Sequence, residues 1–355
     1  MKSKMTEETA TAKYPERIAG TAELEDLLSV PSAELVKMMK RLPGDIMILG
    51  IAGKMGVTMG RLAVRAIREA GVNKKVIGVA RFSHAEDREK LQSWGIETIA
   101  CDLLDQDQVR KLPQAENIIF MAGRKFGTQG GEAQTWAMNA LAPAYTAEHF
   151  RDSRIVAFST GCVYPLVGVD SGGCTEEVVP SPVGEYSQSC LGRERVFQYF
   201  SSKYDTKVLL FRLNYSVDLR YGVLHDIGRS VWEGMPVDNT VGYFNVIWQG
   251  DANAAALRSL ELAESPAAIL NVTGPETASV EKTARMFGRL MGRDVTFKGT
   301  PGDRCYLNDS GKMCRLFGYP SVPLEQLIRW QADWIANGGE SIGKPTHFEV
   351  NNGKF

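Results

Sequence analysis

The sequence predicts an α/β fold, built on a doubly wound parallel sheet and completed by a smaller C-terminal lid. Three observations predict it. Short apolar runs alternate with helix-like segments over most of the first 215 residues, the first run ends in a glycine-rich turn, and the rhythm loosens after about residue 215. Buried strands that alternate with helices at this spacing form parallel sheets with helices on both faces.

The alternation defines a first domain at residues 44–215. Residues 1–43 precede it as a polar tail and a helical extension, with Ser32 as the predicted helix cap. Apolar runs predict strands at 45–50, 75–80, 96–101, 117–123, 154–160 and 207–213. Helical periodicity predicts helices between them at 55–71, 84–94, 105–112, 132–150 and 184–204.

Residues 216–355 are expected to form mainly a substrate-binding lid with irregular connections. Helical segments are expected at 223–234, 253–263, 279–292 and 323–337, and a late strand at 268–274. We expect elements within about 245–275 to return to the first domain.

Composition and charge exclude several classes of protein. The 355 residues are 44% hydrophobic and 23% charged, with a formal net charge of -1, so no basic balance favours nucleic acid. No apolar run is long enough to span a bilayer, and the polar N-terminus lacks the apolar core of a signal peptide. We therefore expect a cytoplasmic protein without nucleic-acid or membrane partners.

The cysteines and histidines do not show the spacing of a metal site. None of the six cysteines forms a CxxC pair, and the four histidines lie far apart in the sequence. A disulfide framework is not expected in a cytoplasmic chain of this size. The sequence thus predicts free thiols and no bound metal.

The glycine-rich turn is the strongest local motif. Gly50, Gly53 and Gly56 follow the first strand directly and open the first helix of the sheet, with Lys54 and Met55 between them. Glycine permits the tight turn and lets the backbone approach a pyrophosphate, which the helix N-terminus then attracts. The turn predicts a Rossmann-like dinucleotide-binding domain.

The GxxGxxG spacing, with further motifs in order, resembles the extended short-chain dehydrogenase/reductase family, the NAD-dependent epimerase/dehydratase group. The resemblance runs from about residue 45 to 334. It implies cofactor contacts from the residues after the third strand, after the fourth strand and on the next helix, namely Asp102, Leu103, Met121, Ala122, Gly123 and Asn139. Later landmarks at 250–252, 270–274 and 309–319 follow in the family's order.

The end of the second strand bears on which nicotinamide cofactor is bound. An NAD-selective site usually places Asp or Glu there to hold the ribose 2′-OH, but this chain has Arg81 and Ser83. Arg81 can pair with a 2′-phosphate and Ser83 can add a hydrogen bond. We favour NADP, while NAD remains allowed if Arg81 stacks on adenine or faces solvent.

The resemblance also implies the reaction centre, and one residue departs from it. The family uses a Ser or Thr after the fifth strand and a Tyr-x-x-x-Lys motif on the next helix. Thr160 and Tyr186 match, but Cys190 stands where the lysine belongs. In the family the tyrosine exchanges a proton with the substrate, and the lysine lowers the tyrosine pKa and holds the nicotinamide ribose.

A cation has to be found elsewhere if Tyr186 is to ionise. An unperturbed tyrosine has a pKa of about 10, and a nearby cation favours its anion. Arg124, Lys125 and Arg193 are the candidates, and we prefer Lys125 because it can approach from the loop side. Alternatively, the loop cations serve solvent or a substrate carboxylate. Cys190 either packs in the space the lysine vacated or, with a lowered pKa, acts as a nucleophile.

The predicted substrate is a secondary alcohol or ketone of a sugar, a sugar acid or a nucleotide sugar. The resemblance places Arg124, Thr160, Asn214 and Tyr215 near it. Gly161 and Cys162 replace the Asp-Glu pair of relatives that eliminate water, which argues against 4,6-dehydratase chemistry. We expect an NAD(P)-dependent epimerase or oxidoreductase; the alternative is a cofactor-binding protein with degenerate catalysis, acting as a sensor or scaffold.

Relatives commonly dimerise through the helices that correspond to 132–150 and 184–204, so we expect a homodimer. Leu191, Val196 and Phe197 are the residues that would contribute, unless they face the sheet of their own subunit. The tail at 343–355 lies beyond the resemblance and covers either the lid or a neighbouring subunit.

Overall fold

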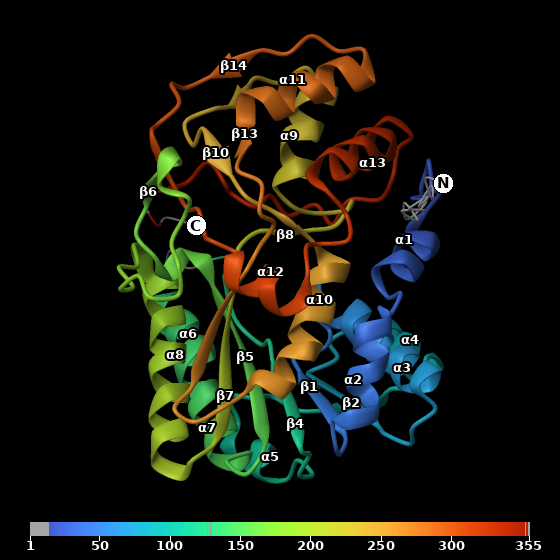
Figure 1. Cartoon of the computed structure of the whole chain (residues 1–355), viewed down its shortest axis with the longest axis vertical. Coiled ribbons are helices and arrows are strands. Elements are labelled where there is room, and N and C mark those ends of the chain that lie inside the picture. The colour runs from blue at the N-terminus through green and yellow to red at the C-terminus, as the bar shows by residue number, and fades with distance from the viewer. Residues whose placement is uncertain (1–13, 126, 128–129, 352, 354–355) are drawn as a thin grey trace, which may run out of the picture.

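The computed structural model describes residues 14–125, 127, 130–351 and 353, and a seven-stranded sheet lies at its centre (Figure 1). Every neighbouring pair in this sheet is parallel. The order is β12 (Ala268–Val272), β7 (Lys207–Leu213), β5 (Arg154–Thr160), β4 (Asn117–Phe120), β1 (Ile46–Leu49), β2 (Val76–Ala80), β3 (Glu97–Ala100). The predicted doubly wound fold is confirmed.

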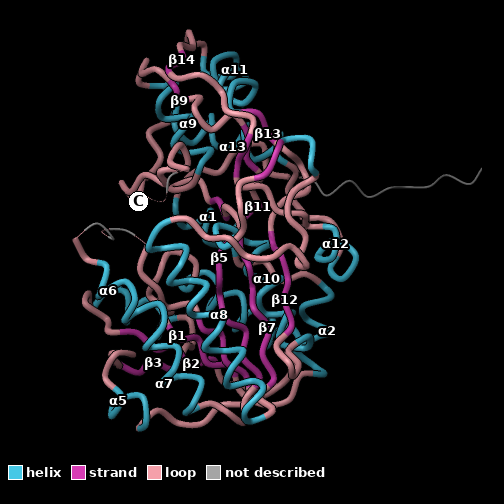
Figure 2. The backbone as a smooth tube through the Cα atoms, turned by 90° about the vertical axis from the view of Figure 1, so that its left-hand side faces the viewer, coloured by secondary structure: helices cyan, strands magenta, loops and turns pink. Residues whose placement is uncertain are grey.

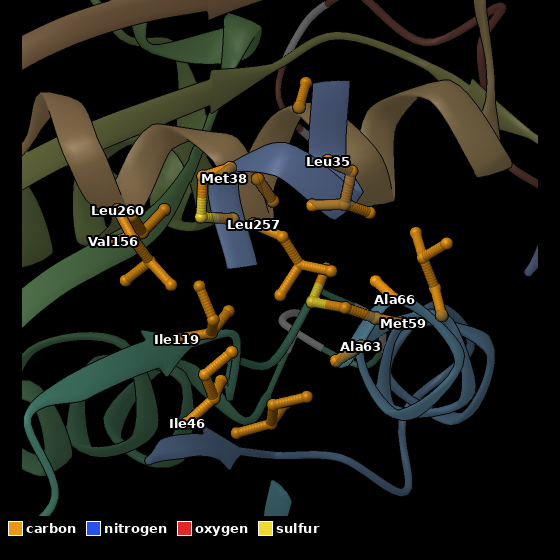
Figure 3. Close-up of a cluster of buried hydrophobic side chains, with 14 of the residues drawn as sticks. Leu35, Met38, Ile46, Met59, Ala63, Ala66, Ile119, Val156, Leu257 and Leu260 are labelled. Atoms are coloured by element: carbon orange, nitrogen blue, oxygen red, sulfur yellow. The ribbon is translucent and has the colours of Figure 1, made fainter. Parts of the chain in front are cut away.

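Helices cover both faces because alternate strand residues point to opposite sides. One face packs against α2 (Ala33–Arg41), α3 (Gly56–Ala70) and α10 (Gln249–Arg258). Figure 3 shows this core, where Leu35 and Met38 from α2 and Met59 from α3 meet Ile119 and Val156 of the sheet. The other face packs against α5 (Gln106–Arg110), α7 (Ala142–His149) and α8 (Gly184–Tyr204).

Most predicted elements form close to their expected bounds, including α4 (Ala85–Ser93), and α2 begins after Ser32, whose Oγ accepts a hydrogen bond from the Leu35 N–H at 3.2 Å. Two differ. The segment 132–150 is divided into α6 (Glu132–Trp136), a π-helical turn Ala137–Leu141 and α7. A further helix, α1 (Thr21–Leu28), precedes α2 and packs mainly on the lid.

The lid has its own core. It is built from α9 (Val223–Trp232), α11 (Val280–Met291) and α13 (Leu324–Ala336), around Phe244, Phe287 and Trp330. Short strand pairs complete it: β8 (Ser216–Val217) with β11 (Ile247–Trp248), β9 (Val237–Asp238) with β14 (Phe297–Lys298), and β10 (Tyr243–Phe244) with β13 (Ala278–Ser279). A pairing of β6 (Val167–Gly168) with β15 (Arg304–Cys305) and the helix α12 (Gly311–Phe317) lie between the lid and the sheet.

The chain end returns to the junction between the lid and the sheet, as both views show (Figures 1 and 2). We call residues 341–351 the C-terminal strap. Within the described ranges, no helix combines the length and apolar character needed to cross a bilayer.

A buried ion pair ties α8 to the centre of the sheet. Arg212 of β7 and Glu194 of α8 are 1% and 0% exposed, and two hydrogen bonds of 2.9 and 2.6 Å join them. The Ser159 hydroxyl on β5 donates to Glu194 at 2.5 Å, and Arg212 donates to the Tyr164 hydroxyl at 2.6 Å. Because both charges are paired and hydrogen-bonded, losing one partner would leave an uncompensated buried charge.

The substitution Glu194→Gln should therefore destabilise the fold strongly. We expect the free energy of unfolding to fall by about 3–5 kcal/mol, the usual cost of leaving one buried charge unpaired. Chemical denaturation at neutral pH, followed by circular dichroism, measures this loss.

Glu34→Gln is the matched control. Glu34 forms an ion pair of 2.8 Å with Lys37, but both side chains are more than half exposed. Exposed pairs contribute about 0–1 kcal/mol, so this variant should unfold close to the wild type. Equal effects of the two substitutions would contradict the structural role of the Arg212–Glu194 pair.

Candidate functional site

The glycine turn lies at the carboxyl end of β1, beside the carboxyl end of β4, where the chain order in the sheet reverses. Gly50 has φ +92°, and a Cβ there would lie 2.8 Å from the Ala122 nitrogen. A Cβ at Gly56 would lie 2.3 Å from the Ile51 carbonyl oxygen, so glycine lets α3 pack against the turn. At Gly53 the nearest atom to an added Cβ is the Gly50 oxygen at 3.3 Å, so the protein alone would nearly admit a side chain there.

Two cavities, of about 310 and 460 Å³, meet at this turn and share Gly50, Gly53, Met121 and Gly123. The first extends towards the lid. It is lined by further predicted site residues: Lys54, Met55, Arg124, Lys125, Thr160, Tyr186, Asn214 and Tyr215. The second extends over β2 and β3, and its lining includes Arg81, Ser83, Asp102, Leu103 and Ala122. A trough of two cavities joined at a glycine turn suits a dinucleotide.

The second cavity carries the side chains that would distinguish NAD from NADP. Arg81 and Ser83 are exposed, and Phe82 between them has φ +50°, which turns the chain sharply after β2. Asp87 of α4 also lines this cavity. A carboxylate therefore lies nearby, although none stands at the end of β2 itself.

Thr160 and Tyr186 meet in the first cavity. Thr160 ends β5, and Tyr186 lies in the first turn of α8, where its side chain hydrogen-bonds to Thr160 and to Cys190. Burial raises the pKa of Tyr186 well above 10, and Cys190 and Cys162 raise it further, while Arg193 and the Thr160 hydrogen bond oppose the rise. At neutral pH the resting tyrosine is therefore protonated.

Cys190 is packed rather than open to the cavities. It is 1% exposed and belongs to a buried cluster with Val163, Tyr164 and Cys174. Burial raises the pKa of its thiol to about 11, so the thiolate that a nucleophile requires is scarce at neutral pH. The packing role fits this environment better than the nucleophilic one.

Lys125 reaches the cavity from the loop after β4. Its Nζ lies 5.9 Å from the centre of the Tyr186 ring and donates to the Thr346 carbonyl at 3.2 Å. Burial lowers the pKa of Lys125, against the influence of Cys162 and Asp226. The Lys125 Nζ thus lies on the Tyr186 side of the first cavity.

Arg193, seven residues after Tyr186, is a second cation at this place. It is 5% exposed and donates to the Phe158 carbonyl at 2.7 Å and to the Asn139 Oδ1 at 2.7 Å. The guanidinium also fills the space beside Gly123, where a Cβ would lie 2.6 Å from Nη2. Arg193 is anchored by the protein and contributes a fixed positive charge to the cavity wall.

Asn139 is fully buried in the π-helical turn and is not among the residues that line either cavity. Its amide binds the Arg124 backbone in both directions at 2.9 Å and donates to the Ser189 hydroxyl at 2.9 Å. It therefore positions the loop after β4 against α8. Gly56 and Cys190 are the other predicted site residues outside the two linings, and both act through packing.

Asn214 and Tyr215 follow β7 at the lid side of the first cavity. The Asn214 amide donates to Asn245 Oδ1 at 2.6 Å, and Asn214 is 2% exposed. Tyr215 has φ +44°, a conformation that is unusual for a tyrosine and turns the chain into the lid. Burial raises the pKa of Tyr215 well above its usual value.

Tyr221 packs against Lys54, with 3.3 Å between the ring centre and Nζ, and Asp226 accepts a hydrogen bond from the Thr346 N–H. Sequence reasoning missed the wall residues of the C-terminal strap because that segment lies outside the recognised motifs. Thr346 lines the first cavity and Lys344 the second. Among the described side chains, no group of three or more His, Cys, Asp or Glu is arranged to hold a metal ion.

Comparisons with known proteins agree with this geometry. Residues 46–216 match the model of the NAD dependent epimerase/dehydratase family, which confirms the predicted resemblance. A sequence comparison with curated proteins finds no match.

Solved structures share the fold at low sequence identity. A mutant UDP-glucuronic acid 4-epimerase from Bacillus cereus, in complex with NAD and a fluorinated UDP-sugar, has 17% identity and a TM-score of 0.68 over 82% of this chain and 99% of that one. UDP-glucose 4-epimerase from Thermotoga maritima, with UDP-glucose, has 18% identity and a TM-score of 0.67 over 82% and 99%. dTDP-glucose 4,6-dehydratase from Bacillus anthracis, with NAD, has 16% identity and a TM-score of 0.68 over 83% and 97%.

Gly53→Ala separates dinucleotide binding from folding. The protein leaves almost enough room for the methyl group, so we expect the free energy of unfolding to change by no more than about 1 kcal/mol. A dinucleotide whose pyrophosphate approaches this backbone would meet the methyl group. We expect its affinity to fall by about tenfold or more, equivalent to about 1.4 kcal/mol.

Calorimetric titration with NAD and NADP measures the affinity, and thermal unfolding measures stability. Gly20→Ala is the control, because an added Cβ there meets no heavy atom of the described chain within 4 Å, far from the turn in sequence. Unchanged affinity in Gly53→Ala would show that the turn does not contact the cofactor.

Proposed function

We propose that the chain, whose residues 46–216 match the model of the NAD dependent epimerase/dehydratase family, is an NAD(P)-dependent epimerase or oxidoreductase acting on a sugar-like secondary alcohol or ketone. The observation that carries the proposal is the meeting of Thr160, Tyr186 and the glycine turn around one cavity. A site that had lost its chemistry would have no reason to keep these groups together.

The residues present fit a nicotinamide dinucleotide. Gly53 is a glycine for which the protein's own packing gives little reason, and it lies where the two cavities join. The adenosine half would occupy the second cavity, beside Asp102 and Arg81. The nicotinamide half would occupy the first, beside Tyr186 and Lys125. When bound, the nicotinamide ring would accept and return a hydride.

Tyr186 would hold the proton that the reaction exchanges. Its hydroxyl, protonated at rest, can donate to a substrate carbonyl oxygen as that carbonyl is reduced, and its anion can accept the proton of an alcohol as that alcohol is oxidised. Thr160 hydrogen-bonds to Tyr186 and would orient the same substrate oxygen. General acid–base catalysis of this kind needs the donor within hydrogen-bond reach of the reacting oxygen.

The cation that the motif lysine usually supplies would come from Lys125, supported by Arg193. A positive charge near the hydroxyl stabilises the tyrosinate, which burial alone disfavours. Arg193 is held by three backbone and side-chain acceptors and cannot move far. Lys125 has a long side chain and comes from the loop after β4, so it is the group that can adjust to the bound substrate.

The charge of the first cavity favours an anionic substrate. None of the described lining residues is acidic, and four are basic: Lys54, Arg124, Lys125 and Arg193. We propose a nucleotide sugar or a sugar acid rather than a neutral free sugar. The epimerases named above bind UDP-sugars, which is the same kind of ligand.

Tyr186→Phe should abolish turnover without removing the cofactor. The variant lacks the exchanged proton, so we expect kcat to fall by about a hundredfold to ten-thousandfold. A panel of sugars, sugar acids and nucleotide sugars, followed at 340 nm and by NMR for epimers, measures turnover. Tyr319→Phe is the control, because Tyr319 is 79% exposed and lines neither cavity.

Turnover that is absent from the wild type on every substrate while cofactor binds would favour the sensor or scaffold hypothesis. Measurable turnover that is unchanged in Tyr186→Phe would contradict the acid–base role of Tyr186. Lys125→Met adds a pH readout. Removing a cation raises the tyrosine pKa, so the rise of the oxidation rate should move to higher pH. A profile that does not move would assign the electrostatic role to Arg193 alone.

NADP is the cofactor we propose from the end of β2. Arg81 and Ser83 are exposed at the cavity where the ribose 2′-phosphate would lie. Asp87 is the group that would instead hold the 2′-hydroxyl of NAD.

Arg81→Ala should weaken NADP and leave NAD unchanged. A lost charge-assisted contact corresponds to about a tenfold to hundredfold loss of affinity. Calorimetry with both cofactors measures it, with Arg68→Ala, an exposed arginine of α3, as the control. Equal affinity of the wild type for NAD and NADP would remove the argument.

A homodimer through α6, α7 and α8 stays part of the proposal. Trp136, Leu141 and Tyr199 on this side are 37%, 44% and 58% exposed. Phe197, by contrast, is fully buried against its own sheet, so it would not contribute.

A further inference from the structure

The C-terminal strap crosses the trough at the place where the two cavities meet. Lys344 lines the second cavity and Thr346, two residues later, lines the first. The strap lies outside the segment that matches the family, which ends at residue 216.

The strap is fixed to the lid on both sides of Lys344. Before it, the Ile342 N–H donates to the Arg220 carbonyl at 3.0 Å, and Ser341 hydrogen-bonds to His225 at 2.9 Å. After it, the Thr346 N–H donates to Asp226 at 2.8 Å. Phe348, 6% exposed, then packs into the core of the lid.

Only the short segment between these anchors spans the trough. Gly343, with φ +68°, Lys344 and Pro345 are exposed. On the sheet side, the Lys125 Nζ donates to the Thr346 carbonyl at 3.2 Å. The strap thus joins the lid to the loop after β4 directly above the glycine turn.

The strap adds a third lysine, Lys344, to Lys54 and Lys125 at the junction of the two cavities. Burial, followed by the charges of Lys125 and Lys344, lowers the pKa of Lys54 to about 8, and Asp226 and Asp218 offset this only in part. Three ammonium groups from three separate segments therefore repel one another around the turn. A phosphate between them would reverse that repulsion.

We propose that the strap is a clasp over the dinucleotide, in which Lys344 binds a phosphate group of the cofactor and residues 341–351 must move before the cofactor leaves. The inference rests on the proposed cofactor site. The phosphate is either the pyrophosphate, which NAD and NADP share, or the 2′-phosphate, which only NADP carries.

Lys344→Gln tests the contact in the full-length protein. The residue is exposed, so the fold should be unaffected. We expect the dissociation constant to rise about tenfold or more, as for the loss of one charge-assisted contact, mainly through faster dissociation. A loss for both cofactors identifies the pyrophosphate, and a loss for NADP alone identifies the 2′-phosphate.

Calorimetry and stopped-flow fluorescence give the affinities and dissociation rates. Lys40→Gln, an exposed lysine of α2, is the matched control. Hydrogen exchange supplies an independent readout, since amides of residues 341–351 should exchange more slowly when cofactor is bound.

Affinities and dissociation rates in Lys344→Gln within twofold of the wild type would overturn the proposal. Exchange in the strap that does not change on cofactor binding would also overturn it. If the wild type binds neither NAD nor NADP, the proposed function fails instead, so the two failures are distinguishable.

Discussion

The buried pair of Arg212 and Glu194 is the interaction on which the site's geometry depends. It holds α8 against β7, and through the Ser159 hydroxyl it also fixes the end of β5. Those three elements carry Tyr186, Asn214 and Thr160, respectively. Since the pair is bidentate and lacks solvent, the helix cannot slide along the sheet without separating two buried charges. The buried pair, which lies outside the cavities, thereby sets the distances between Tyr186, Asn214 and Thr160.

The protonation state of Tyr186 follows from its burial in this scaffold. Burial holds the proton on Tyr186, and the two neighbouring thiols provide no compensation because they supply no positive charge. Any ionisation of the tyrosine must then rely on cations at positions other than that of the motif lysine. Arg193 is locked in place by Asn139 and the Phe158 carbonyl, whereas Lys125 is attached to the lid through the strap. Under the proposed role of Lys125, part of the charge comes from the loop after β4 instead of the helix and depends on lid position.

The sequence predicted the fold well because its signals are local. Apolar runs, the glycine turn and Ser32 as a cap each specify a strand, a turn or a helix end without reference to distant residues. Asn139 was expected to contact the cofactor, but its amide is saturated by Arg124 and Ser189. Asn139 lies in a π-helical turn, and the residue pattern of 132–150 does not predict such a turn. Lys344, Thr346 and Asp226 were missed for a related reason: their meeting is tertiary, and no short motif marks it.

The segments outside the family match share one place in the fold. At the N-terminal end, Glu25 of α1 pairs with Lys90 of α4 at 2.7 Å and with Arg220 of the lid at 3.2 Å. At the C-terminal end, the strap joins the lid to Lys125. Arg220 is followed by Tyr221, whose ring lies against Lys54 of the glycine turn. Both additions therefore fix the angle between lid and sheet, the variable that decides whether the groups of the lid reach a ligand in the trough. Under the proposed role of Lys125 the cation comes from a loop, and such a site has greater need of that restraint than one whose lysine lies on the same helix as its tyrosine.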